Sequence, residues 1–77
     1  MSLPKEIMVL RQRMYMTQNE FAQALNVSFT TVNRWETGKA RPNISTMKEL
    51  KKYCEGKSVD YSSVENAWLE AGLEKKG

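Results

Sequence analysis

One short stretch of the chain is rich in side chains that form hydrogen bonds and poor in side chains that catalyse reactions. Its members are Thr30, Thr31, Asn33 and Arg34. Hydroxyl, amide and guanidinium groups can donate or accept hydrogen bonds at a flat polar partner. The 77 residues include no histidine and one cysteine, Cys54, which excludes imidazole acid–base catalysis, histidine-dependent nucleophiles and Cys-cluster metal sites. The sequence therefore favours a binding module over an enzyme, and predicts no metal and no cofactor.

The length of the chain limits the number of domains, and its charge indicates the kind of partner. A chain this short can bury enough surface for only one core, so we expect a single domain over residues 1–73 and a flexible tail over 74–77. Residues 1–57 carry ten basic and five acidic side chains, for a charge of +5, whereas residues 58–77 carry −2, so the total is +3. A basic body with an acidic end is compatible with a polyanionic partner.

The single cysteine and the short apolar runs predict a cytoplasmic location. A lone cysteine cannot form an intramolecular disulfide, and it suits the reducing cytoplasm. The longest unbroken apolar run, residues 7–10, is far too short to cross a bilayer, and no signal peptide or small-molecule site is expected.

Residues typical of helix starts and ends divide the chain into five segments. None of these segments alternates apolar and polar residues as a strand does, so we predict an all-α fold. The segments are at about residues 4–14, 17–25, 28–36, 44–54 and 60–71. The fourth places Ile44, Met47, Leu50 and Cys54 inward, and the fifth Tyr61, Val64, Trp68 and Ala71, with Gly72 as its end. Phe21, Trp35 and Tyr53 are expected in the core, and Lys48, Lys51 and Lys52 on a solvated face.

The second and third segments have clear start and stop signals. Thr17 and Glu20 have the spacing of a capping box, Asn26 tolerates the left-handed end of a helix, and Ser28 is a good N-cap. Two short helices joined this tightly, with small Ala22 allowing close approach, predict a helix-turn-helix. The major groove of DNA admits one α-helix, so the polar face of the third segment, at residues 28–36, is suited to reading base edges.

Several strings together resemble the Xre/Cro/phage-repressor (lambda-repressor-like) family of DNA-binding domains. The match covers about residues 5–55 and leaves the helix at 60–71 as an addition. It is carried by 10–13 (LRQR), 17–22 (TQNEFA), 27–28 (VS), 32–39 (VNRWETGK) and 41–42 (RP). The resemblance implies a compact five-helix domain with its helix-turn-helix at helices two and three.

The resemblance also implies roles for residues near the helix ends. Gln18, with Thr17 beside it, matches the position that anchors the domain on a DNA phosphate, although Gln18 can also be an ordinary solvated residue. Arg11 and Glu36 match a buried ion pair, for which a direct phosphate contact of Arg11 is the alternative.

Base reading is implied for the face of the third helix. The positions are Phe29, Thr30 and Arg34, with Thr31 and Asn33 nearby. Arg34 can donate to guanine, or instead to a phosphate. Phe29 stands where relatives often have a polar residue that braces Gln18, so we expect that bracing to be lost. Phe29 then either contacts a thymine methyl or tucks against the second helix as core.

Backbone contacts are implied for the segment that follows the third helix. Lys39 and Arg41 are expected to neutralise phosphates and to give salt-dependent affinity. Asn43 can add a phosphate hydrogen bond, but it serves at least as well as the N-cap of the fourth helix.

These roles imply a bacterial or phage transcriptional regulator, repressor-like, that binds the major groove of double-stranded DNA. The competing hypothesis is a protein-interaction module, such as an antitoxin-like partner or a helix-turn-helix scaffold that no longer reads DNA. The fifth helix either completes the core or, through Trp68, Leu69 and Leu73, contributes to a homodimer contact.

Overall fold

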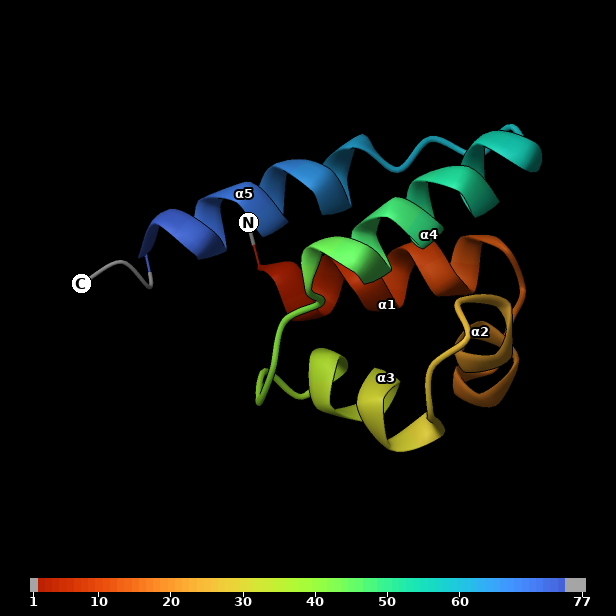
Figure 1. Ribbon diagram of the computed structural model, residues 1–77, viewed down its shortest axis with the longest axis horizontal. Coiled ribbons are helices and arrows are strands. Elements are labelled where there is room, and N and C mark those ends of the chain that lie inside the picture. The colour runs from red at the N-terminus through yellow and green to blue at the C-terminus, as the bar shows by residue number, and fades with distance from the viewer. Residues whose placement is uncertain (1, 75–77) are drawn as a thin grey trace.

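Five helices make up the protein in the computed structural model, which describes residues 2–74. They are α1 (Leu3–Arg13), α2 (Gln18–Ala24), α3 (Phe29–Glu36), α4 (Ile44–Gly56) and α5 (Ser62–Glu74). Helices α1, α4 and α5 run along the length of the molecule, while α2 and α3 lie together at one side (Figure 1). No strand occurs in residues 2–74, and the predicted all-α class is confirmed.

Side-chain caps explain where four of the helices begin. Ser2, Thr17, Ser28 and Asn43 each have extended backbone angles and accept a hydrogen bond from the backbone N–H three residues on. Such a cap satisfies an N–H group that the helix itself leaves without a partner. Because α2, α3 and α4 all start at predicted caps, the polar residues of the first turns sit where the sequence analysis places them.

The core lies between α1 and the other helices. Helix α3 packs on both α1 and α2, and α5 packs on α1. The inner side of α3 is supplied by Val32 and Trp35, so its other side faces outward. The buried apolar set is Leu3, Ile7, Leu10, Phe21, Ala22, Leu25, Val32, Trp35, Leu50, Cys54, Val64 and Ala67.

Two sequence-based expectations about the later helices were wrong, and one buried residue was missed. Ile44, predicted inward, is 64% exposed, because it occupies the first turn of α4, where neighbouring helices cover little of it. Gly72 does not end α5, which continues to Glu74, and residues 75–77 of the expected tail lie outside the described residues. Ala67 is buried although it was not predicted, since a small side chain lets α5 approach the core.

Candidate nucleic-acid interface

Helix α2 starts with the predicted capping box. The Thr17 hydroxyl accepts from the Glu20 backbone N–H at 3.1 Å, and the Glu20 carboxylate accepts from the Thr17 N–H at 2.8 Å. Gln18 is thereby held as the first residue of α2. Its side chain lies at the end of the helix where the backbone dipoles give a partial positive charge.

A four-residue link, residues 25–28, sets α3 against α2. Asn26 has φ of 61°, the left-handed conformation expected of it, and the Val27 N–H donates back to the Ala22 carbonyl at 2.9 Å. Ser28 follows as the N-cap of α3 and accepts from the Thr31 N–H at 3.1 Å. Hydrogen bonds therefore hold both the end of α2 and the start of α3, and they keep the two helices in one relative placement.

An ion pair connects α1 to the end of α3. Arg11 donates through Nε to Glu36 Oε2 at 2.7 Å and through Nη2 to Glu36 Oε1 at 2.9 Å. This bidentate geometry fixes the orientation of the guanidinium plane relative to the carboxylate plane. The side chains are 13% and 2% exposed, respectively. The hydrogen bond to Glu36 raises the pKa of Arg11. Arg11 also donates to the Met16 carbonyl at 3.0 Å, so the same guanidinium holds the loop before α2.

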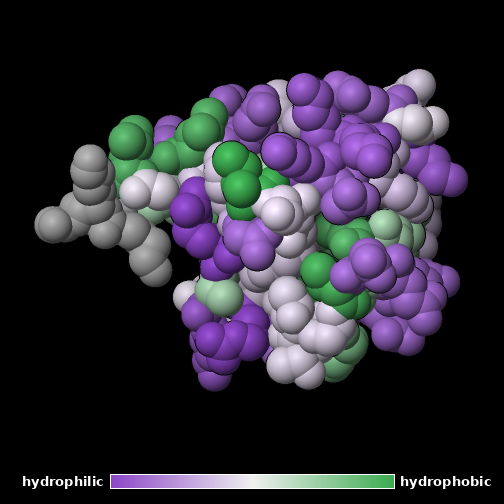
Figure 2. All heavy atoms as spheres, in the orientation of Figure 1, coloured by the Kyte–Doolittle hydropathy of each residue, from purple (hydrophilic) through white to green (hydrophobic). Residues whose placement is uncertain are grey.

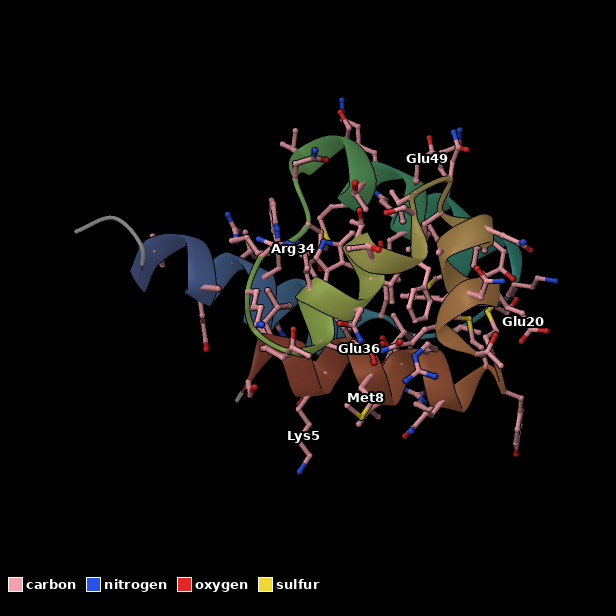
Figure 3. All side chains as sticks on the ribbon, turned by 90° about the horizontal axis from the view of Figure 1, so that it is seen from below. Lys5, Met8, Glu20, Arg34, Glu36 and Glu49 are labelled. Carbon is pink, nitrogen blue, oxygen red and sulfur yellow. The ribbon has the colours of Figure 1, made fainter. Side chains whose placement is uncertain are left out.

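Gln18 is braced by residues other than Phe29, a source of bracing that the sequence analysis did not predict. Its amide nitrogen donates to Glu36 Oε1 at 2.9 Å, and its amide oxygen accepts from Asn33 Nδ2 at 3.4 Å. Asn33 and Glu36 are three residues apart and therefore share one face of α3. That spacing is the sequence signal from which a second source of bracing could have been predicted. Figure 3 shows Glu36 between α3 and α1.

The outward side of α3 carries most of the predicted base-reading residues. Thr30, Asn33 and Arg34 are exposed, whereas Thr31 is half-buried and its hydroxyl lies 2.8 Å from that of Ser28. Phe29 is 50% exposed, so it does not serve as extra core. The structure thus brings one aromatic, one guanidinium and several small polar groups to the same helix surface.

The loop after α3 begins with a left-handed turn. Gly38 has φ of 81°, which a side chain would strain, and it lies close to Pro4 of α1. The Lys39 side chain is exposed, and its backbone carbonyl accepts from Arg34 Nη2 at 3.4 Å. At the far end of the loop, Asn43 accepts from the Thr46 N–H at 2.9 Å, so it is the cap of α4.

Arg41 departs from its predicted placement. Its guanidinium turns to α5, donates through Nη2 to the Trp68 carbonyl at 2.7 Å and lies 4.5 Å from the centre of the Trp68 ring. The Trp68 indole N–H in turn donates to the Pro42 carbonyl at 2.6 Å. Arg41 is therefore partly buried against α5 instead of standing beside Lys39. Sequence spacing could not show this, because Trp68 lies 27 residues further along the chain.

Comparison with known proteins identifies this arrangement. A family model described as "Helix-turn-helix" matches residues 7–62. The chain belongs to the helix-turn-helix family. The match confirms the resemblance found in the sequence, and the helix-turn-helix itself is formed by α2, the 25–28 link and α3.

A curated relative gives a more specific likeness. The chain is 34% identical over 53 residues to "HTH-type transcriptional activator BcrR" of Enterococcus faecalis. The aligned region is 69% of this chain but 26% of that protein, so the chain spans about a quarter of the relative's length. No solved structure matches the chain significantly.

Three further observations concern the thiol, the acidic groups and the helices of residues 2–74. Cys54 is buried, and burial raises the pKa of its thiol from 9.0 to about 11, which keeps it protonated and unreactive at neutral pH. Across residues 2–74, no cluster of three or more His, Cys, Asp or Glu side chains could hold a metal ion. None of the helices described is both long and apolar enough to cross a bilayer.

Proposed function

We propose that this chain is the DNA-binding module of a transcriptional regulator and that α3 enters the major groove. The observation that carries the proposal is the exposed polar face of α3, joined through Asn33 and Glu36 to a braced Gln18 at the start of α2. This arrangement presents base-reading and phosphate-binding groups on two rigidly connected helices. Such an activity is binding without catalysis and needs no cofactor, and a DNA partner would place the chain in the cytoplasm.

Base reading is assigned to the outer side of α3. Arg34 can donate twice to guanine O6 and N7, and the exposed Phe29 ring can pack on a thymine methyl. Thr30 adds a hydroxyl beside them. We assign Thr31 and Asn33 secondary roles, because their side chains already bond to Ser28 and Gln18.

Phosphate contacts are assigned to both ends of the helix-turn-helix. Thr17 and Gln18 lie at the positive end of α2, and Lys39 is exposed after α3. Asn43 caps α4 through its side-chain oxygen Oδ1, which leaves its side-chain NH₂ group as a donor for a phosphate. Arg41 is omitted from this set, since its guanidinium is bonded to α5.

The test is a fluorescence-anisotropy titration of random duplex DNA at several salt concentrations. Wild-type affinity should fall steeply with salt. Arg34→Ala/Lys39→Ala should bind more weakly, and its salt slope should be smaller by about 0.9 for each phosphate that is no longer neutralised. Lys52→Ala/Lys57→Ala is the matched control, because it removes the same charge from exposed residues at the far end of α4. Equal effects of the two double variants would contradict the proposed face.

We further propose that the module works as a homodimer. Exposed Ile44, Leu69 and Leu73 gather where the start of α4 meets the second half of α5, which Figure 2 shows as hydrophobic surface. The patch is flanked by Lys48 and Lys51 on α4 and by Glu65 on α5, so a two-fold partner can set α5 of one copy against α4 of the other with opposite charges facing.

One alternative function is a protein-interaction module such as an antitoxin-like partner. The exposed Phe29 ring favours it, because exposed apolar side chains often mark protein contacts. The same titration separates the two functions. Salt-independent or absent DNA binding favours a protein partner, and a pull-down with Phe29→Ala as the control then follows.

A further inference from the structure

Helix α5 lies almost wholly outside the segment that defines the family, yet it makes the strongest contacts to the loop beside the proposed DNA face. The family match ends at residue 62, where α5 begins. We propose that Trp68 and Arg41 form a clamp through which α5 positions residues 39–43 for DNA binding. This inference rests on the proposed function and assigns Arg41 and Trp68 as positioning residues.

The clamp is reciprocal, which is why it can hold the loop in one place. Arg41 donates to the Trp68 carbonyl at 2.7 Å, and the Trp68 indole N–H donates to the Pro42 carbonyl at 2.6 Å. The guanidinium also lies 4.5 Å from the indole centre, within range of a cation–π attraction. Two hydrogen bonds in opposite directions and a stacked cation together fix both the side chain and the backbone of the loop.

The space around Arg41 is closely fitted to α5. A Cβ added at Gly72 would lie 3.0 Å from Arg41 Nη2, so a side chain at position 72 would push the end of the guanidinium away from its present place. Arg41 Nε is buried as well and has no hydrogen-bond partner among the described residues. The guanidinium is thus committed to α5, and its value to DNA binding is indirect.

The loop that is held carries proposed phosphate contacts. It starts with exposed Lys39 and ends with Asn43, the cap of α4. A loop already ordered in the free protein loses less conformational entropy when it binds. Loosening the clamp should therefore weaken DNA binding even though no group that touches DNA has been removed.

The experiment measures DNA affinity and its salt slope for Arg41→Met, Trp68→Phe, their double variant and Gly72→Ala. Each single variant should bind about two- to tenfold more weakly, the range expected when one more side chain or loop must be ordered on binding. The double variant should be no weaker than the weaker single variant, and the salt slope should stay at the wild-type value. Sedimentation in parallel ensures that binding is compared at one oligomeric state.

Two variants separate positioning from general stability. Gly72→Ala puts a better helix former in α5 and displaces only the far end of Arg41, so it should keep or raise the melting temperature while weakening DNA binding. Cys54→Ala makes a small cavity in the core near the other end of α4, so it should lower the melting temperature and leave DNA affinity unchanged in the folded range.

Three results would overturn the clamp while leaving the proposed function intact. One is wild-type affinity in Trp68→Phe and Gly72→Ala. Another is a salt slope reduced by about 0.9 in Arg41→Met, which would make Arg41 a direct phosphate contact. The third is additive effects in the double variant. Wild-type protein that does not bind DNA would overturn the proposed function and this inference together.

Discussion

Single residues in unusual backbone conformations show where this small domain tolerates strain. Tyr15 sits in the turn between α1 and α2 with φ of 57°, and its side chain is 95% exposed. A left-handed conformation costs a residue with a Cβ roughly 1–2 kcal/mol, and an exposed ring recovers little of that by packing. Asn26, by contrast, is a residue type that accepts this conformation easily.

Replacing Tyr15 with glycine should therefore stabilise the protein. We expect the free energy of unfolding of Tyr15→Gly to rise by about 0.5–1 kcal/mol, because relief of backbone strain exceeds the entropy that glycine adds to the unfolded chain. Urea unfolding followed by circular dichroism measures it. Tyr15→Ala is the control, since it removes the ring but keeps the Cβ, and it should not stabilise. A Tyr15→Gly protein less stable than Tyr15→Ala would show that the turn is not strained.

At the scale of elements, the Arg11–Glu36 pair is the main polar connection between α1 and α3. Glu36 is almost completely buried, so removing its partner leaves a carboxylate whose charge is poorly compensated. The same carboxylate also accepts from Gln18. The pair therefore links the packing of α3 to the group proposed to anchor DNA.

A double-mutant cycle tests that connection. Arg11→Met alone should lower the free energy of unfolding by about 3 kcal/mol, and Arg11→Met/Glu36→Leu should be more stable than the sum of the two single effects predicts. Thermal or urea unfolding of the four proteins gives the coupling energy. Arg13→Met serves as control, because Arg13 is exposed and should change stability by only a few tenths of a kcal/mol. Additive effects at positions 11 and 36 would mean that the pair does not hold α3.

Local signals in the sequence were enough to predict five helices and the caps at which α2, α3 and α4 start. The capping box at Thr17 and the caps at Ser28 and Asn43 depend on residues three apart, so spacing alone reveals them. Long-range partners were not predictable in this way. The turn of Arg41 toward Trp68 depends on how α5 packs. For Gln18, spacing shows that Asn33 and Glu36 share one face of α3, but their contact with Gln18 depends on the distance between two helices.

At the scale of the whole molecule, the exposed apolar patch at Ile44, Leu69 and Leu73 is the feature least suited to an isolated monomer. A two-fold dimer would cover it. It would also present two copies of α3 to DNA, as is needed to read half-sites about 34 Å apart.

Changing the patch should therefore change the oligomeric state. We expect sedimentation equilibrium to show a dimer for the wild type and a monomer for Leu69→Lys, because burying an unpaired charge in an apolar contact is costly. Tyr15→Lys is the control, the same charge introduced at a more exposed position far from the patch along the chain. A wild-type protein that stays monomeric at high micromolar concentration would contradict the dimer.

One atom in this domain serves two purposes. Glu36 Oε1 accepts from both Arg11 of the scaffold and Gln18 of the proposed DNA face. Releasing Gln18 by moving α3 away would break the buried ion pair at the same time, so the outer face cannot open as a separate cooperative unit. Loss of binding competence and loss of the native state then become a single event, and a protease that cuts the opened chain would end DNA occupancy without any intermediate, partly active form.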